Sequence, residues 1–320
     1  MARIGLVLGA GGATGGAFHA GMLAALAEGR GWDPRQAEII LGTSAGSVSG
    51  AMLRAGFSGA DLAARLENRP LSPQGAALLQ SMGLPPGAPP AAERPGAPSR
   101  PGPANPAILL AAARRPWAVR PMSVMAGLIP EGPVSTSMIS HAVGAMLGDR
   151  WPAQPLWIAA VRLEDARLVV FGRPGAPAAT PAQAVAASCA IPGWFAPVRI
   201  GASRYVDGGA HSLTNLSRMA AAGVDLVIVS APLGRAGRRG YHGAMRQAAR
   251  AQLTMEAEIL RRRGIAVVAF QPTEDDQAVM GPDAMDASRR AAVVRQVRRS
   301  TLTRLGQPEV ARRLQVLSRS

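Results

Sequence analysis

Two short apolar runs that end in glycine constrain the fold of this chain more than any other feature. The first, RIGLVLG, spans residues 3–9, and the second, AEIILG, spans residues 37–42. Continuous apolar runs of this length are typical of strands buried on both faces, as in parallel sheets. Each run precedes a stretch with helical spacing, over residues 16–29 and 44–56. This strand–helix–strand–helix order predicts a parallel α/β sheet with right-handed crossovers. The small residues of the first helix are expected to pack closely on that sheet.

The same pattern returns in the second half of the chain. Apolar runs predict further strands at residues 155–163, 167–172, 198–209, 224–232 and 265–272, the third of these being a short hairpin. Helical spacing predicts helices at residues 135–147 and 180–193, and Arg-rich helices over 283–318 that divide near GQPE. We therefore expect a three-layer α/β/α fold with a mainly parallel central sheet, in one domain over residues 1–320.

Residues 71–133 interrupt the alternation of strands and helices. Proline and glycine are dense there and reach their peak in residues 83–106, which excludes a regular helix or strand interior. Loops of this length are usually functional or disordered. We predict a flexible insertion that borders the substrate pocket as a mobile cover, with short helices over residues 76–82 and 107–115.

The amino-acid composition limits the classes of molecule that the chain is expected to bind. The formal net charge is +15, and every basic side chain is arginine because the chain contains no lysine. Such a charge favours contact with anionic surfaces, either a membrane or a nucleic acid. Zinc-ligand spacing, a helix-turn-helix signature and aromatic residues interleaved for base stacking are all missing, so we expect no nucleic-acid partner. Peripheral contact with an anionic membrane surface is the favoured alternative.

The sequence also bears on location. No uninterrupted apolar run reaches about 20 residues, so no transmembrane helix is predicted. The first 27 residues have some features of a signal peptide, but glycines and His19 interrupt them and the strand interpretation is favoured. Cys189 is the single cysteine, which excludes an intrachain disulfide and a cysteine-based metal site. We expect a cytoplasmic protein, with contact at the inner face of the membrane as a further option.

The first of three glycine-bearing motifs is LGAGGATGG, at residues 8–16. Thr14 stands where a dinucleotide fingerprint needs its third glycine, and a nucleotide P-loop needs a lysine. A loop of free backbone N–H groups before a helix remains, and it suits an anion such as the oxyanion of acyl transfer. The alternative is a tight turn that only lets the helix and the strand pack closely.

The other two motifs carry candidate catalytic side chains. GTSAG, at residues 42–46, places Ser44 between a strand and a helix, which is the context of a nucleophile elbow. The following helix would add partial positive charge near a developing negative charge. The alternative is that Ser44 only caps this helix. YVDGG, at residues 205–209, places Asp207 at a strand end, and taken alone it would be an ordinary turn aspartate.

Together the three motifs resemble those of the patatin-like phospholipase family. The glycine loop, GTSAG, and ASCAIPGWFAPV leading into YVDGG occur in the order and spacing of that family. The resemblance implies a lipid acyl hydrolase with a Ser–Asp dyad, in which Ser44 is the nucleophile and Asp207 the general base. It implies an oxyanion hole at the backbone N–H groups of Gly11 and Gly12, a lipid or acyl-ester substrate, and neither cofactor nor metal. The glycines that would support these motifs are Gly9, Gly15, Gly42, Gly46, Gly208 and Gly209.

One departure from the family concerns Thr14, because the family loop usually carries Arg or Lys at that position. The difference bears on rate and head-group preference rather than on the dyad. A second point concerns the base, since an aspartate in water is too weak to activate a hydroxyl. Burial among Trp194, Phe195 and Val206 is expected to raise the pKa of Asp207 toward working pH.

Two rival interpretations stay open. In a conventional Ser–Asp–His triad, His211 or His242 would be the base, because both follow Asp207 and the chain order permits it. His211 is expected on a connecting loop and His242 in a loop-like, Arg-rich segment. Alternatively, the chain is a non-catalytic relative that binds a lipid or a partner in the same pocket.

Three other side chains have more ordinary expected roles. His19 is expected on a helix face near the glycine loop, or else lining the site. His141 is expected to be an ordinary helix residue, and Cys189 a packing residue at a helix end.

Overall fold

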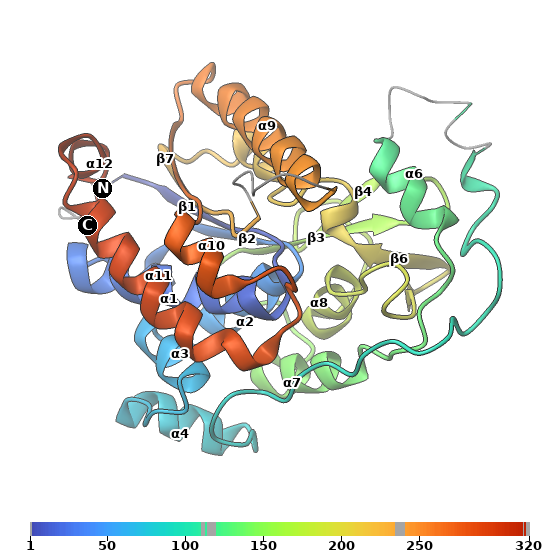
Figure 1. The fold of residues 1–320 in the computed structure, drawn as a ribbon, viewed down its shortest axis with the longest axis horizontal. Coiled ribbons are helices and arrows are strands. Elements are labelled where there is room, and N and C mark those ends of the chain that lie inside the picture. Colours follow the sequence, from blue (N-terminus) through green and yellow to red (C-terminus); the bar gives the residue numbers. More distant parts are fainter. Residues whose placement is uncertain (1, 110–112, 114–119, 234–240, 316, 318–320) are drawn as a thin grey trace.

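The computed structural model describes residues 2–109, 113, 120–233, 241–315 and 317, with side chains from 247 onward in the helix that begins at 241. Its strands form one sheet in the order β5-β6-β3-β2-β1-β7-β8, and β4 also pairs with β3 (Figure 1). The strands are β1 (Ile4–Leu8), β2 (Ile39–Gly42), β3 (Leu156–Arg162), β4 (Leu168–Phe171), β5 (Val198–Ile200), β6 (Ser203–Asp207), β7 (Leu226–Ser230) and β8 (Ala266–Phe270).

The sheet is mainly parallel, as predicted. β1 lies in its middle and pairs in parallel with β2 and β7, and the pairs β2–β3 and β7–β8 are parallel as well. β4, β5 and β6 add antiparallel pairings at the β3 end. The carboxyl ends of the parallel strands therefore lie along one edge of the sheet, which is where ligands bind in open α/β sheets.

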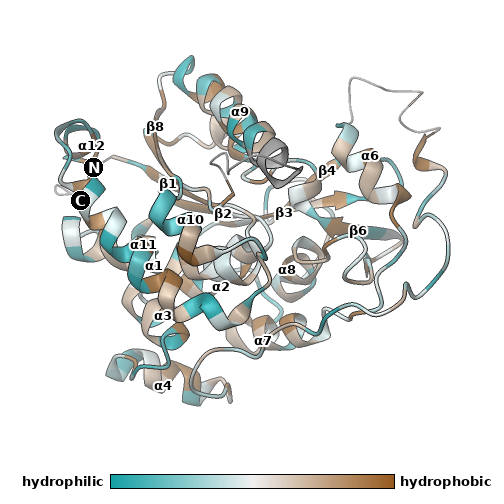
Figure 2. Cartoon of the chain, viewed as in Figure 1, coloured by the Kyte–Doolittle hydropathy of each residue, from teal (hydrophilic) through white to brown (hydrophobic). Residues whose placement is uncertain are grey.

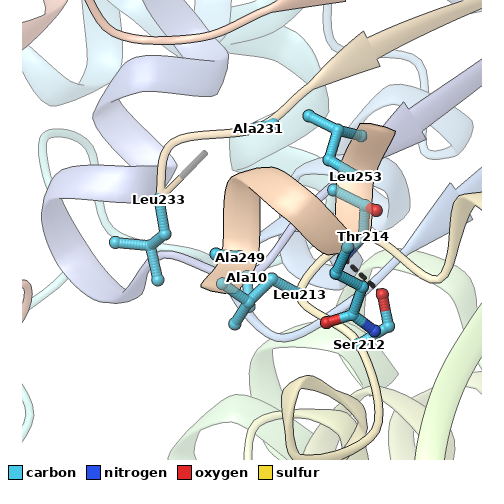
Figure 3. A pocket seen from close by; sticks show the side chains of 9 residues that line it. Ala10, Ser212, Leu213, Thr214, Ala231, Leu233, Ala249 and Leu253 are labelled. Carbon is cyan, nitrogen blue, oxygen red and sulfur yellow. Dashed lines mark hydrogen bonds between the residues drawn. The ribbon is translucent and has the colours of Figure 1, made fainter. Parts of the chain in front are cut away.

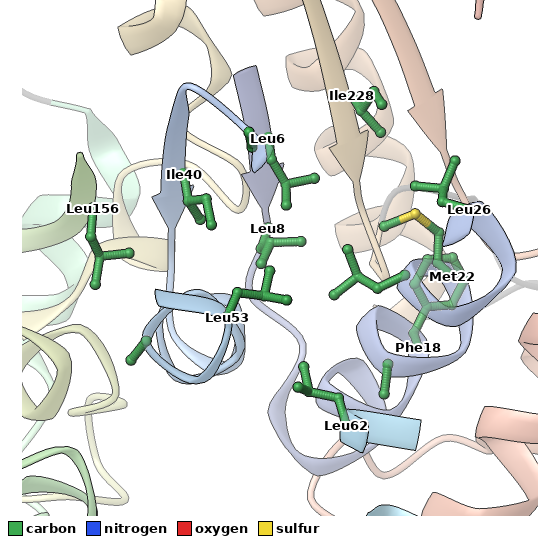
Figure 4. Packing of buried hydrophobic residues seen from close by; sticks show 14 of the residues in the cluster. Leu6, Leu8, Phe18, Met22, Leu26, Ile40, Leu53, Leu62, Leu156 and Ile228 are labelled. Atoms are coloured by element: carbon green, nitrogen blue, oxygen red, sulfur yellow. The ribbon is translucent and has the colours of Figure 1, made fainter. Parts of the chain in front are cut away.

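Alternate residues of the strands face two separate cores. Leu6 and Ile40 pack on one face, whereas Val7 and Leu41 pack on the other. The first core contains side chains of the helices α1 (Gly12–Arg30), α2 (Ala45–Arg54) and α8 (Pro181–Ser188) (Figure 4). The second contains side chains of α9 (Tyr241–Arg261) and of the 3-10 helix η4 (Leu216–Ala221). Helices thus cover both faces, which confirms the three-layer α/β/α fold.

The remaining helices surround these layers, and Figure 2 shows hydrophilic residues on the outer helices and hydrophobic ones along the central strands. They are α3 (Gly59–Leu66), α4 (Pro73–Ser81), α6 (Pro121–Leu128), α7 (Ser137–Leu147), α10 (Glu274–Met280), α11 (Arg290–Leu305), α12 (Pro308–Arg313) and the 3-10 helices η1 (Pro34–Gln36), η3 (Gly208–Ala210) and η5 (Ala287–Arg289). The break between α11 and α12 falls at GQP, near the predicted position. In the described part of the chain, no helix is long and apolar enough to cross a membrane.

The small residues of α1 pack differently from the prediction. A Cβ on Gly21 would lie 2.6 Å from the carbonyl oxygen of Val294, so this part of α1 receives α11 rather than the sheet. Arg298 on α11 also pairs with Glu28 on α1 at 2.7 Å. Part of the C-terminal arginine content is therefore used to hold α11 in place.

The insertion takes a defined path along the surface. Residues 83–106 contain no helix or strand, as predicted. The helix α6 was not predicted, although Pro121 stands in its first turn, where proline favours helix initiation. The strap of residues 83–106 is anchored where Trp194 donates to the carbonyl of Glu93 (2.9 Å) and Arg94 pairs with Asp283 (3.2 Å). Its mobility stays a prediction, and most of the helix expected at 107–115 lies outside the described residues.

Two other expectations were wrong in detail. The segment around His242 was expected to be loop-like, but His242 belongs to α9, a 21-residue helix. The helix expected to run to residue 193 ends at Ser188, and Cys189 caps it. The helix breaker Pro192 therefore acts beyond the end of α8 rather than at it.

Candidate active site

Two strand ends meet at the carboxyl edge of the sheet. Ile158 of β3 pairs with Gly42 of β2, and Ala160 of β3 pairs with Asp207 of β6. Because β4 pairs with both of these β3 residues on the opposite side, β2 and β6 must share one edge of β3, end to end. The antiparallel direction of β6 points its carboxyl end at that of β2. This arrangement brings Asp207 to the turn that carries Ser44.

Ser44 has the strained backbone of a nucleophile elbow. It adopts φ 53° and ψ −125° at the N-terminus of α2, a region that non-glycine residues rarely occupy. Its backbone N–H donates to the hydroxyl of Ser188 (2.9 Å). Its side chain makes no capping hydrogen bond, so the interpretation of Ser44 as a helix cap is wrong. The turn depends on glycine, because a Cβ on Gly46 would lie 2.0 Å from the carbonyl oxygen of Leu8.

Asp207 is a buried carboxylate whose pKa is raised. Burial raises the pKa to about 6, while hydrogen bonds from the Ser44 hydroxyl and the Gly209 N–H act in the opposite direction. The Gly209 bond measures 2.7 Å. Phe195 and Val206 are buried as expected, whereas Trp194 is partly exposed. The predicted rise in pKa is confirmed, and a carboxylate of this pKa remains largely ionised at neutral pH.

The glycine loop follows β1 next to the Ser44 turn, since Leu8 pairs with Gly42. Helix α1 begins at Gly12, earlier than predicted, so Gly15 lies inside the helix and donates to the Gly11 carbonyl (2.8 Å). Among described residues, the N–H groups of Gly11 and Gly12 have no acceptor. These two free donors beside Ser44 are what an oxyanion would require.

The other motif glycines line the same strand ends. Gly9 donates to the carbonyl of Ser230 at 2.9 Å, and Gly42 ends β2. A Cβ on Gly208 would lie 2.4 Å from the carbonyl oxygen of Ala159, so only glycine lets the chain leave β6 this close to β3. Gly209 donates to Asp207, as described above. All the predicted site residues thus gather at one edge of the sheet.

Thr14 contacts a different part of the chain. Its N–H and hydroxyl bind the carbonyl of Ala284, at 3.0 and 3.4 Å. A Cβ on Gly12 would lie 2.7 Å from the same oxygen and 2.8 Å from the Met285 sulfur. Residues 284–285 therefore cover the N-terminus of α1. They also bind the Thr14 side chain, which stands at the position where the family usually has Arg or Lys.

His19 supports the glycine loop from inside the protein. It lies on α1 near the glycine loop, as expected, and it is fully buried. Its Nε2 lies 2.8 Å from the Gly9 carbonyl oxygen and must donate, which leaves Nδ1 to accept from the Ser230 hydroxyl at 2.7 Å. Burial lowers its pKa to about 4, and the hydrogen bond to Gly9 opposes this shift. His19 is thus a neutral side chain that joins the ends of β1 and β7.

Asn215 is a site residue that the sequence analysis missed. Its amide donates to the Thr43 hydroxyl (3.1 Å), the Gly208 carbonyl (3.3 Å) and the Ser212 carbonyl (2.8 Å). It therefore ties the turn before Ser44 to the loop after Asp207. Its left-handed backbone, φ 51°, is one that asparagine tolerates well, and that preference is the only available sequence signal.

None of the rival side chains that the structure describes forms a triad with Asp207. Both ring nitrogens of His211 are buried without a partner among the described residues, so His211 does not bind the Asp207 carboxylate. The side chain of His242 lies outside the description. Burial, and secondarily the charge of Asp207, raise the pKa of Cys189 to about 12, which disfavours a reactive thiolate. His141 is an exposed residue of α7, as predicted.

The site is closed in this conformation. Ser44 is 4% and Asp207 5% exposed. The cavity in Figure 3, between Ala10, residues 212–214 and α9, has a volume of about 10 Å³, enough for one water molecule. A second cavity has a volume of about 200 Å³. It is lined by Ala91, Ala92 and Arg94 of the strap on one side, and by Trp194 and residues 285–288 on the other. It adjoins Met285, which packs against the glycine loop.

The chain is similar to a known protein family. A family model described as patatin-like phospholipase matches residues 6–219. Among curated proteins, no match was found. Among solved structures, the crystal structure of VipD from Legionella pneumophila is similar at 15% identity and a TM-score of 0.39, over 94% of this chain and 67% of that one.

Proposed function

Because the chain belongs to the patatin-like phospholipase family, we propose that it hydrolyses carboxylic esters of lipids, with Ser44 as nucleophile and Asp207 as general base. The observation that carries this proposal is the strand pairing that brings the buried Asp207 carboxylate to the turn of Ser44, close enough for the Ser44 hydroxyl to lower the pKa of Asp207 against the effect of burial. The strained turn at Ser44 and the free N–H groups of the glycine loop support it. Phospholipase A and lysophospholipase activities are the favoured reactions.

The proposed reaction proceeds in two steps. The Ser44 oxygen attacks the ester carbonyl and its proton passes to Asp207, while the N–H groups of Gly11 and Gly12 stabilise the oxyanion. Asp207 then returns the proton to the leaving alcohol, and an acyl ester remains on Ser44. Water attacks this ester with Asp207 again as base, and the fatty acid leaves. The raised pKa of Asp207 makes it a stronger base than an exposed aspartate.

The cover over the site bears on how a lipid would enter. The second cavity lies between the strap of residues 83–106 and Met285, which packs against the glycine loop. We assign it to the acyl chain. Because Ser44 and Asp207 are almost fully covered, part of the chain must move before an ester reaches them, and we propose residues 284–285 or the strap as that part.

A lipid surface is the proposed place of action. Exposed apolar side chains gather on the insertion, where Leu109, Met122 and Met125 are each at least 50% exposed. Met122 and Met125 lie on α6, and this helix contacts the loop after Asp207, since Ser123 donates to the Ala210 carbonyl at 3.2 Å. Contact of this region with a membrane would therefore place lipid near the active site. The net charge of +15 favours an anionic, cytoplasm-facing surface.

Labelling with a fluorophosphonate probe tests the dyad. Intact mass and peptide mapping should find one adduct, on Ser44, in the wild type. Ser44→Ala should remove it, and Asp207→Asn should slow labelling strongly. Ser49→Ala is the matched control, because Ser49 lies on α2 and its hydroxyl binds only the Ala45 carbonyl. It should label like the wild type.

The same experiment separates the rival functions. An adduct on Ser44 that is insensitive to Asp207→Asn but lost on removing His211 would replace the dyad by a histidine-dependent triad. Absence of any adduct on folded protein, also in the presence of lipid vesicles, would favour a non-catalytic protein that binds lipid or a partner.

A further inference from the structure

Charged side chains meet on the α9 side of the loop that follows Asp207. Arg120 donates to the His211 carbonyl (3.2 Å), and its other terminal nitrogen lies 3.5 Å from a carboxylate oxygen of Glu256. Gln252 donates to the same His211 carbonyl (3.1 Å). Arg218 lies on η4, which packs against α9. We call Arg120, His211, Arg218 and Glu256 the basic cluster.

Donors in the basic cluster lack acceptors. Three buried nitrogen atoms have no hydrogen-bond partner among the described residues. They are the two ring nitrogens of His211 and the Nε of Arg218. More than nine in ten buried polar groups are normally bonded, so unpaired ones point to a missing ligand. Burial and the charges of Arg120 and Arg218 lower the pKa of His211 to about 3, which leaves a neutral ring with one N–H donor.

The cluster also carries surplus positive charge. Burial lowers the pKa of Arg218, Glu256 opposes this shift, and the charges of Arg120 and Arg173 add to it. Glu256 pairs with Arg120 and attracts Arg218, and among the described residues no second carboxylate pairs with either guanidinium group.

We propose that the basic cluster is an anion subsite that binds the phosphate of a phospholipid head group during hydrolysis at Ser44. Guanidinium groups bind phosphate oxygens with paired, charge-assisted hydrogen bonds, and the N–H of His211 adds a third donor. Arg120 is about one third exposed, so an anion can reach the cluster from solvent. The anion subsite stands on its own contacts, whereas its assignment to a head group rests on the proposed function.

The position of the cluster fits this role. His211 follows Asp207 by four residues, which span at most about 14 Å even when extended. Part of this segment is the 3-10 helix η3, which shortens the distance further. In a phospholipid the phosphate is separated from the ester carbonyls only by the glycerol carbons. A phosphate held at the cluster would thus leave an ester close to the Ser44–Asp207 pair.

Binding to the full-length Ser44→Ala protein tests the subsite without any need for catalysis. Isothermal titration with inorganic phosphate should show saturable binding, and dihexanoyl phosphatidylcholine below its micelle concentration should compete for it. Arg218→Gln should weaken phosphate binding about tenfold or more, since it removes a charged hydrogen-bond donor. Arg262→Gln, which removes the same charge from an exposed position just after α9, should bind like the parent.

The outcomes are distinct. Competition between phosphate and the short-chain phospholipid supports the head-group assignment. Phosphate binding without lipid competition supports the anion subsite with free phosphate as its ligand. No phosphate binding to the folded parent, or equal weakening in Arg218→Gln and Arg262→Gln, overturns the proposal. Should Arg218→Gln fail to fold, Arg120→Gln at the more exposed position replaces it, and failure of hydrolysis in the wild type would leave all these binding results valid.

Discussion

Two histidines lie on the two sides of the active-site edge, and their surroundings differ. His19 lies under the glycine loop and uses both ring nitrogens, for Gly9 and for Ser230. His211 lies beyond Asp207 and uses neither. Burial lowers the pKa of both rings, so both are neutral at neutral pH. The comparison teaches that burial alone does not define a role: the bonded ring holds the scaffold, and the unbonded one is available to a ligand.

The contrast extends to the neighbours of each histidine. On the His19 side, backbone groups of Gly9 and Ala10 are bonded to adjacent strand ends and loops. On the His211 side, Asp207 keeps a charge in a buried place, and the Nε of Arg218 has no hydrogen-bond partner among the described residues. We therefore expect substitutions on the His19 side to cost stability and those on the His211 side to cost mainly function.

The largest effect is expected from Asp207→Asn. Loss of the proposed base should lower ester hydrolysis about 10²- to 10⁴-fold. The same change should stabilise the protein at pH 8 by about 2–3 kcal/mol, because the folded-state pKa is raised from 3.8 to about 6 and each unit is worth about 1.4 kcal/mol. Urea unfolding at pH 8 measures this difference.

The sign of the Asp207 effect gives a control within the same experiment. A carboxyl with a raised folded-state pKa destabilises the protein above about pH 6 and no longer does so below about pH 4. The advantage of Asp207→Asn should therefore vanish near pH 4. A variant that is less stable than the wild type at pH 8 would show that the burial of this charge costs little.

The histidines themselves provide the next largest effect. His19→Ala should destabilise the protein by about 2–4 kcal/mol, through a cavity and the unpaired Gly9 and Ser230 groups. His211→Ala should cost less, because its ring makes no hydrogen bond in the described structure. Thermal or urea unfolding compares the two, with the exposed His141→Ala as the reference. Equal losses for His19 and His211 would remove the contrast between the two sides.

Acid titration separates the two histidines from Asp207 by sign, because the lowered pKa of His211 acts in the same direction as that of His19. His19 has a folded-state pKa of about 4 against 6.5 when free, so its contribution to stability falls as pH drops from about 6.5 to 4. Asp207 contributes with the opposite sign in nearly the same window and masks this slope. In Asp207→Asn the stability should therefore fall by about 3 kcal/mol or more over this range. A flat profile in that variant would contradict the buried, neutral state of His19.

Asn215→Ala is expected to have a smaller, mixed effect. It removes the hydrogen bonds from the Asn215 amide to Thr43 and Gly208, which join the turn before Ser44 to the loop after Asp207. This loss should cost about 1–3 kcal/mol of stability. Probe labelling of Ser44 should also slow. Asn215→Gly is the matched variant, since glycine keeps the left-handed backbone without the amide. If it labels as fast as the wild type, the amide has no positioning role.

Thr14→Val should have the smallest effect. It keeps the shape of the side chain and the N–H bond to Ala284, and loses only the hydroxyl bond at 3.4 Å. We expect a loss of about 0.5–1.5 kcal/mol in urea unfolding. Faster probe labelling together with this loss would indicate that residues 284–285 restrict access to the site. Unchanged labelling would assign the cover to the strap instead.

Local sequence information determined the alternating elements and the motif positions. Apolar runs were sufficient for the strands, because burial on both faces requires continuous apolar residues. The same reasoning placed Ser44 and Asp207 at strand ends. It missed the helices α3, α6, α9 and α10. α6 lies in a segment dominated by proline, and α9 has an Arg-rich, polar surface that resembles a loop in composition.

Only the tertiary structure decided which strand ends meet and which polar groups find partners. That β2 and β6 share one edge of β3 depends on long-range pairing, which no local pattern contains. Likewise, the sequence marks His19 and His211 only as histidines. Their different roles follow from Gly9 and Ser230 on one side and from Arg120 and Arg218 on the other, and these neighbours are brought together by folding.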